Sequence, residues 1–243
     1  MMDTLDHVVF SIIIPTKNEE KQISDCLEKI YQQDTDLPFE VIIVDSSSTE
    51  QTHDIGKAFT ANVIEEPRRG KGIAVHTGAR TAKGSILCFT EADCHVPPNW
   101  LTVIHDEFQN NLDTVAVTGD YDYHDSTRFY NLLLKIALFL SIRGYYLLYK
   151  NHYIRGTNFA VRASSYKQAG EFSLQAKELQ DVEFGLRLRK FGKIRFIPSM
   201  KIKTSARRIQ GRLFRFIIEF IPPFYKLFIL KQVPTDVTYQ DIR

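Results

Sequence analysis

Two carboxylates that close a short apolar run are the first candidates for chemistry in this 243-residue chain. Residues 85–94 read SILCFTEADC, and the run has the length and the side chains of a buried strand. Glu91 and Asp93 follow it directly, and a carboxylate cannot stay buried without a partner. Mg²⁺ and Mn²⁺ prefer oxygen ligands, and Mg²⁺ often takes only one or two from protein, with water and phosphate supplying the rest. The pair therefore suggests a cation site against a phosphate, with a polar turn after a strand as the plain alternative.

The segments that must position this pair alternate between strand-like and helix-like patterns. Strands are expected at 8–14, 41–44, 62–66, 85–90 and 114–118, and helices at 19–33, 51–60, 71–82 and 97–110. The alternation predicts an α/β fold with a mostly parallel sheet and helices on both faces. Ligands of such sheets bind at the carboxyl ends of the strands.

Polar residues follow four of these strands. A lone acid at a strand end is usually a helix N-cap, and Asn18 or Asp45 alone would be read that way. Carboxylates or amides after four strands would instead converge on one edge of the sheet, which favours a ligand site. The residues after the four strands are Pro15, Asn18 and Glu19; Asp45; Glu91 and Asp93; and Gly119, Asp120 and Asp122.

A loop of glycines and cations, RRGKG at 68–72, precedes the acidic strand. Gly70 and Gly72 would let the backbone approach a ligand closely, and Lys71 with Arg68 or Arg69 could neutralise a diphosphate. A solvated turn is the alternative. Neither GxxxxGK[ST] nor GxGxxG occurs in the sequence, which disfavours P-loop and nicotinamide-binding proteins.

The second half departs from strict alternation. Residues 128–150 form a long apolar helical pattern, either a packing helix or one that contacts a membrane surface or a partner. Residues 155–162 look like a strand edge with turn residues, and 180–192 read as an amphipathic helix. Asp181 and Glu183 occupy its first turn, where the helix dipole favours acids. The functional alternative for this turn is a positioned general base.

Charge is concentrated near the C-terminal end, although the net charge is only +2, too small to argue for nucleic acid. Residues 201–231 contain eight Lys or Arg against one acid, Glu219, an excess that suits phosphates or an anionic membrane surface. Within 206–243, a basic and aromatic amphipathic helix is expected up to Pro222 and Pro223, which must end or kink it. Peripheral contact with a membrane and packing on the catalytic domain or a second subunit remain equal alternatives, so a homo-oligomer stays open.

Composition indicates an ordinary globular protein, with 44% hydrophobic and 25% charged residues. Cys26, Cys88 and Cys94 lack C-x-x-C spacing, which fits a reducing compartment without a zinc site or a disulfide framework. The acidic N-terminal residues argue against a signal peptide, and no run of about 18 apolar residues suggests a membrane-spanning helix. A cytoplasmic protein is expected, with peripheral contact to the inner face of the membrane as one option.

The whole pattern resembles the family 2 glycosyltransferases, inverting enzymes with the GT-A fold and a Rossmann-like nucleotide-binding sheet. The segments that carry the resemblance span roughly residues 9 to 200 and keep the family's order. They are SIIIPTKNEE, VIIVDSSSTEQT, GKGIAVHTGARTAKGSILCFTEADC, GTNFAVR and QDVEFGLRLRKFG.

The resemblance implies a metal-dependent transfer of a hexosyl group from a UDP- or GDP-linked sugar to an acceptor hydroxyl. An acceptor on a lipid or a cell-envelope glycan is one option. It implies a nucleotide-binding half over about 1–120, an acceptor half over 121–205 and a separate C-terminal segment, 206–243. Asp93 would be the ligand of Mg²⁺ or Mn²⁺, and Asp181 would be the general base. The donor would be bordered by Pro15, Thr16, Asn18, Glu19, Asp45, Lys71, Glu91, Ala92, Arg207 and Arg208.

Three departures from the family pattern bear on activity. Glu91 replaces the first Asp of the Asp-x-Asp motif, Gln180 replaces the Glu that precedes the base, and VDSSSTE lacks the acid that usually follows Asp45. We read these changes as variation within an active enzyme, while Glu91 and Gln180 keep open a non-catalytic nucleotide-sugar-binding protein. A sugar-phosphate nucleotidylyltransferase is disfavoured, because PTKNEE stands where that class has a GxGTR-type loop.

Overall fold

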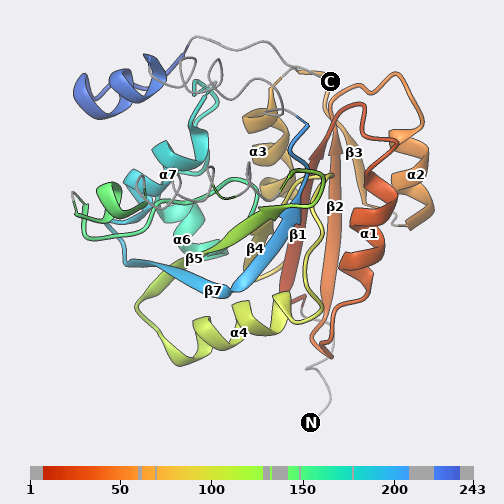
Figure 1. Ribbon diagram of the computed structural model, residues 1–243, viewed down its shortest axis with the longest axis horizontal. Coiled ribbons are helices and arrows are strands. Elements are labelled where there is room, and N and C mark those ends of the chain that lie inside the picture. Colours follow the sequence, from red (N-terminus) through yellow and green to blue (C-terminus); the bar gives the residue numbers. More distant parts are fainter. Residues whose placement is uncertain are drawn as a thin grey trace.

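A seven-stranded sheet forms the centre of the computed structural model (Figure 1). The structure describes residues 8–59, 62–68, 70–127, 132, 142–147, 149–176, 178–207 and 222–235. The strands are β1 (Phe10–Thr16), β2 (Phe39–Asp45), β3 (Val63–Glu65), β4 (Ile86–Phe89), β5 (Thr114–Tyr123), β6 (Phe159–Arg162) and β7 (Lys193–Thr204). The helices are α1 (Ile23–Tyr31), α2 (Thr52–Phe59), α3 (Lys71–Thr81), α4 (Trp100–Asn110), α6 (Ala163–Gln168), α7 (Gln180–Leu188) and a π-helix, η1 (Tyr225–Ile229).

The strands lie in the order β3-β2-β1-β4-β6-β5-β7, and their pairing is parallel except at β6. β6 runs antiparallel to both of its neighbours, β4 and β5, whereas β5 and β7 pair in parallel. The mostly parallel sheet predicted from the sequence is therefore present. The carboxyl ends of six strands and the beginning of β6 meet at a single edge.

The sheet is buried on both faces because successive side chains of its strands point to opposite sides. On one face, Ile12 and Ile14 of β1 pack with α1 and with Trp100 of α4. On the other, Ile13 packs with residues of α3 and with Phe184 of α7. Each fully buried large apolar side chain contributes roughly 1.5–3 kcal/mol, so this double core fixes the strand ends in place.

Three details of the sequence-based picture are corrected. β5 continues to Tyr123, so the predicted strand end at 118 is wrong and Asp120 and Asp122 lie within the strand. Their carboxylates form ion pairs with Arg155 at 2.8 Å and with Lys201 at 2.6 Å. β6 is an internal strand rather than the edge expected at 155–162, and β7 was not expected.

The second half is described only in part. Residues 142–147 of the predicted 128–150 helix are helical, whereas the predicted helix before Pro222 lies outside the described residues. Within the described ranges, no helix has the length and apolarity needed to cross a membrane. Cys26, Cys88 and Cys94 are all buried and unbridged.

Candidate active site

Four carboxylates lie buried at the carboxyl ends of β1, β2 and β4. Glu19 follows β1, Asp45 ends β2, and Glu91 and Asp93 follow β4; their exposed fractions are 5%, 2%, 8% and 4%. Such groups cost several kcal/mol each unless they are paired or hydrogen-bonded. The convergence expected from the sequence is therefore real for three of the four strand ends, and each carboxylate has a specific set of partners.

Asp45 is held by the two loops that leave β1 and β2. Its Oδ1 accepts hydrogen bonds from Thr16 Oγ1 at 2.9 Å and Ser48 Oγ at 2.5 Å, and its Oδ2 accepts one from the Ser48 backbone N–H at 2.9 Å. Asn18 ties the same loops together, because its N–H donates to Ser48 Oγ at 2.8 Å and its Oδ1 accepts from Thr49 N–H at 2.9 Å. Pro15 lies beside Val44 in the β1–β2 register. The hydroxyl run thus makes a rigid, polar rim around Asp45.

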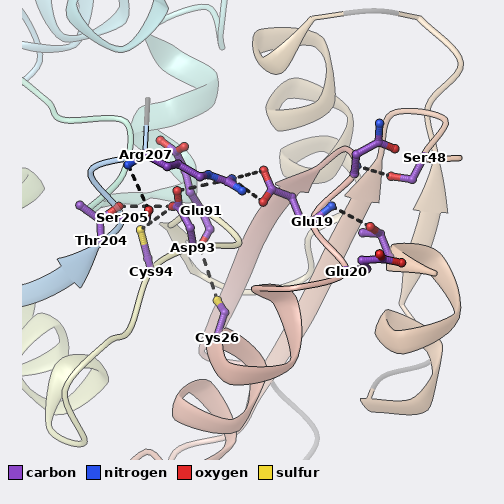
Figure 2. Close-up of polar contacts among 12 residues, drawn as sticks. Glu19, Glu20, Cys26, Ser48, Glu91, Asp93, Cys94, Thr204, Ser205 and Arg207 are labelled. Atoms are coloured by element: carbon purple, nitrogen blue, oxygen red, sulfur yellow. Dashed lines mark hydrogen bonds and ion pairs between the residues drawn. The ribbon is translucent and has the colours of Figure 1, made fainter. Parts of the chain in front are cut away.

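Arg207 reaches Glu19 and Asp93 from the end of β7 (Figure 2). Asp125 accepts a hydrogen bond from the Ala206 N–H at 2.6 Å, which fixes the chain just before the arginine. The Arg207 Nη2 atom then lies 2.6 Å from Glu19 Oε1 and 3.6 Å from Asp93 Oδ2. A guanidinium is suited to such a site because it is always charged and carries several donors.

The other carboxylate oxygen of Asp93 is bound by the end of β7. Thr204, the last residue of β7, donates its hydroxyl to Asp93 Oδ1 at 3.3 Å. Cys94 and Cys26 lie directly beneath, with the Cys26 thiol 3.4 Å from the Glu91 carbonyl oxygen (Figure 2). Burial, followed by the nearby charge of Asp93, raises the pKa of the Cys26 thiol, so it stays neutral under the acidic pair.

Lys71 links the acidic pair to the start of α7. It is the first residue of α3, and its Nζ lies 2.5 Å from Glu91 Oε1. The next residue, Gly72, permits a close approach of the two helix starts, since a Cβ there would lie 2.7 Å from the Gln180 side chain. The lysine ammonium therefore stands between Glu91 and the first turn of α7.

Asp181 lies in that first turn. Its Oδ2 accepts the Gly156 N–H at 2.6 Å, and its Oδ1 accepts the Val182 N–H at 2.9 Å. A Cβ on Gly156 would lie 3.1 Å from Asp181 Oδ2 and 3.5 Å from Lys71 Nζ, so the three groups converge. Burial raises the pKa of Asp181, and the Lys71 charge opposes this rise. The Asp181 carboxyl is thus held by two backbone N–H groups beside a cation.

The remaining residues singled out from the sequence have other surroundings. Ala92 packs its side chain into the core. Arg68 pairs with Glu66 at 2.7 Å, and Glu183 pairs with Arg187 at 2.7 Å along α7. Arg69 and Arg208 lie outside the described residues.

Sequence reasoning missed two residues just before β6 that brace this edge. Asn158, fully buried, accepts Trp100 Nε1–H at 3.0 Å and donates to the carbonyls of Asp120 at 2.9 Å and Met200 at 2.7 Å. Arg155 is also buried and donates to Gly119 O at 3.0 Å as well as to Asp120. The only sequence signal was the polar RGTN segment directly before the apolar residues of the strand.

Comparison with known families matches residues 11–170 to glycosyl transferase family 2. The chain belongs to this family. The match includes β1 through α6, and therefore every carboxylate of the edge except Asp181. The resemblance inferred from the sequence is thereby confirmed.

Two relatives match parts of this chain and parts of their own longer sequences. Glycosyltransferase AglE of Haloferax volcanii is 31% identical over 126 residues, which cover 49% of this chain and 38% of AglE. The probable glycosyltransferase YdaM of Bacillus subtilis is 27% identical over 208 residues, covering 78% of this chain and 49% of YdaM. The chain thus spans less than half the length of either relative.

Solved structures confirm the α/β GT-A-like fold. The mannosyltransferase PcManGT from Pyrobaculum calidifontis, in complex with GDP-Man and Mn²⁺, aligns with a TM-score of 0.70 and 20% identity over 94% of this chain and 66% of its own. Glucosyl-3-phosphoglycerate synthase from Mycobacterium tuberculosis, in complex with Mn²⁺, UDP and phosphoglyceric acid, gives 0.64 and 17% over 87% and 76%.

The carboxyl edge of the sheet suits a metal ion that substrate phosphate helps to coordinate better than one coordinated by protein alone. Over the described ranges, no three His, Cys, Asp or Glu side chains are grouped so that they could hold a metal ion. Asp93 offers a buried carboxylate at the edge, while Glu91 is paired with Lys71. One carboxylate completed by water and phosphate oxygens is a donor set that Mg²⁺ accepts, so the residues fit.

Proposed function

We propose that the chain is an inverting, metal-dependent glycosyltransferase that moves a hexosyl group from a UDP- or GDP-sugar to an acceptor hydroxyl. The observation that carries this proposal is that four side chains gather at one sheet edge of a family-2 chain. They are Asp93, Glu91, Lys71 and Asp181. It sets a candidate phosphate-and-metal site beside a candidate base. The GDP-Man and UDP in the two structural relatives support the donor class.

The donor would lie across the ends of β1, β2 and β4. Pro15, Thr16 and Asn18 would border the nucleotide, and Asp45 would accept a hydrogen bond from its base or ribose. Asp45 is suited to this role because Thr16 and Ser48 already fix its orientation. Lys71 and Arg207 would face the diphosphate, since their cations lie on either side of the acidic pair. Ala92 would contribute backbone only, and Arg208 would add a further cation.

Asp93 would hold the divalent cation, and Glu91 would lie against the ribose or the same cation. Such a cation stabilises the negative charge that develops on a leaving diphosphate. Arg207 would add to that stabilisation once the diphosphate draws it away from Glu19. Lys71 keeps Glu91 oriented during this change.

Asp181 would take the proton of the acceptor hydroxyl. Its two backbone hydrogen bonds fix the carboxylate, and the Lys71 charge opposes the rise in its pKa that burial causes. The acceptor oxygen then attacks the anomeric carbon from the face opposite the diphosphate, which inverts the configuration. General-base help of this kind is worth on the order of 10²–10⁴-fold.

A non-catalytic nucleotide-sugar binder is the second candidate, favoured by Glu91 and Gln180 at the two altered motif positions. Gln180 donates to the Ala176 carbonyl at 2.7 Å, so its side chain is occupied in bracing α7. Such a protein would bind donor at the same edge without turnover.

Thermal-shift screening of UDP, GDP and their sugars, with and without Mn²⁺, tests the donor site. One nucleotide class should raise the melting temperature, and Mn²⁺ should increase the rise for wild type but not for Asp93→Asn. The absence of any nucleotide-dependent shift would refute the proposal.

Three expectations about partners and location remain predictions. They are the absence of a nucleic-acid partner, association of the chain with itself, and a cytoplasmic location. The mass of the purified protein in solution tests the second of these.

A further inference from the structure

Two segments far apart in the sequence pack against each other, and both expose large apolar side chains. Six of the eleven exposed large hydrophobic residues in the described part of the chain belong to residues 142–153 and 222–235. We call these six the aromatic face. They are Tyr146, Leu147, Phe224, Tyr225, Ile229 and Leu230, with exposed fractions of 39%, 58%, 41%, 53%, 65% and 46%.

The second segment is held on the protein by one side only. Leu227 of η1 is buried in a cluster with Tyr145 and Val182, and the Phe228 ring lies 5.8 Å from the Tyr149 ring. Tyr225 and Ile229, two residues before and after Leu227, are exposed. Packing on the catalytic domain thus accounts for the inner side of this segment and leaves its outer side uncovered by any described residue.

The charged residues of the two segments that bear the aromatic face have one sign. The described residues of the two segments include Arg143, Lys150, Lys226 and Lys231, and no Asp or Glu. Exposed aromatic and aliphatic side chains among Lys and Arg are typical of segments that lie at a membrane–water interface. Each basic residue near an anionic membrane adds to binding, whereas an apolar protein partner would gain nothing from this charge.

The segments that bear the aromatic face pack against the first turn of α7, which holds the candidate base. Leu179 and Val182, which flank Gln180 and Asp181, both pack into the cluster formed by Tyr145 and Leu227. In Figure 1 the C-terminal helical segment lies beyond α7, and α4 lies at the opposite end of the molecule. Whatever covers the aromatic face is therefore brought to the acceptor side of the site.

We propose that the aromatic face docks on an anionic lipid bilayer and sets Asp181 at the membrane surface, so that the acceptor hydroxyl belongs to a lipid-linked molecule. The acceptor class rests on the proposed function, whereas the docking itself does not. Tyr225, Ile229 and Leu230 enter the headgroup region, and Lys150, Lys226 and Lys231 meet the lipid phosphates.

Vesicle flotation tests the docking directly. Wild type should float with phosphatidylcholine vesicles that contain phosphatidylglycerol, and far less with phosphatidylcholine alone. The triple variant Tyr225→Ser/Ile229→Ser/Leu230→Ser should lose about tenfold or more in partitioning, and Lys226→Glu/Lys231→Glu should lose the preference for anionic lipid. The matched controls Leu112→Ser and Lys83→Glu change exposed residues elsewhere and should float like wild type.

The outcomes separate docking from catalysis. Flotation of the triple variant at the wild-type level, or failure of wild type to float, would overturn the docking. A wild-type dimer that the triple variant turns into a monomer, measured without lipid by sedimentation, would assign the aromatic face to a second copy instead. Nucleotide-induced thermal shifts of all variants report folding and the donor site independently, so a protein that floats but binds no nucleotide refutes only the proposed function.

Discussion

The guanidinium of Arg207 lies 3.6 Å from the Asp93 carboxylate. The two residues are more than a hundred positions apart, and β7 brings them together by pairing in parallel with β5. Arg207 also binds Glu19, so one side chain carries the positive charge against two buried carboxylates. A divalent cation at Asp93 would compete with this arginine.

Removal of the Arg207 charge should therefore strengthen binding of Mn²⁺ alone. Arg207→Met is expected to raise the affinity about three- to tenfold, a modest gain because Arg207 is partly exposed and its attraction is screened. The same variant should bind UDP or GDP more weakly, since a diphosphate contact is lost. Isothermal titration with MnCl₂ measures the first effect. Lys193→Met, which removes a surface cation paired with Asp113, is the control.

An unchanged or lower Mn²⁺ affinity in Arg207→Met would show that the arginine and the cation do not share Asp93. Arg207→Lys should lie between wild type and Arg207→Met, because a lysine keeps the charge but loses the forked geometry.

The Glu19–Arg207 pair should also be visible in stability. Glu19 is 5% exposed, so Arg207→Met leaves a buried carboxylate without its guanidinium and should cost about 1–3 kcal/mol of the free energy of unfolding. Glu19→Gln/Arg207→Met should cost clearly less than the sum of the two single variants. Urea unfolding of the four proteins measures the coupling, and strict additivity would mean that the pair does not form.

The pH dependence of transfer should report Asp181 and Lys71. Burial raises the pKa of Asp181, so kcat/KM should fall with decreasing pH at a higher pH than for an exposed aspartate. Lys71 favours the ionised carboxylate, and Lys71→Met should move this acid limb to still higher pH. Lys71→Arg should leave it close to wild type. If the acid limb of Lys71→Met stays at the wild-type pH, Lys71 does not influence the ionisation of Asp181.

The close approach of β5 and β7 depends on Gly119. A Cβ at this position would lie 1.8 Å from the Met200 carbonyl oxygen and 2.3 Å from Asn158 Nδ2. Gly119→Ala should therefore cost about 3 kcal/mol or more. The control is Gly144→Ala, where the added methyl meets nothing within 4 Å and the helix should be unchanged or slightly more stable. Thermal unfolding compares them, and equal stabilities would contradict the close approach at Gly119.

The alternation of strands and helices was enough to predict the first half of the fold. Apolar runs such as those around Ile12 and Ile43 have a clear period and clear turns beside them, and both strands were found where expected. The end of β5 was missed because its pattern turns polar at Gly119, and Asp120 and Asp122 find partners only through Arg155 and Lys201. Such long-range ion pairs leave no trace in a local pattern.

The candidate site, too, was predicted from the sequence only in part. Asp45, Glu91 and Asp93 could be found because each stands directly after a strand of a parallel sheet. The pairing of Lys71 with Glu91, and the position of Lys71 beside Asp181, depend on how α3 and α7 pack. Likewise, Asn158 reaches the edge only because β6 runs antiparallel, which no pattern within residues 155–162 specifies.

The most direct test of the proposed transfer is donor turnover by wild type and Asp181→Asn under one set of conditions. Using the nucleotide sugar that stabilises the protein, release of the nucleoside diphosphate is followed with Mn²⁺ present. Wild type should release it, and Asp181→Asn should be slower by about 10²–10⁴-fold while its nucleotide-induced thermal shift stays unchanged. Equal turnover by the two proteins would contradict the role of Asp181 as the base, and binding without turnover in both would identify a nucleotide-sugar binder.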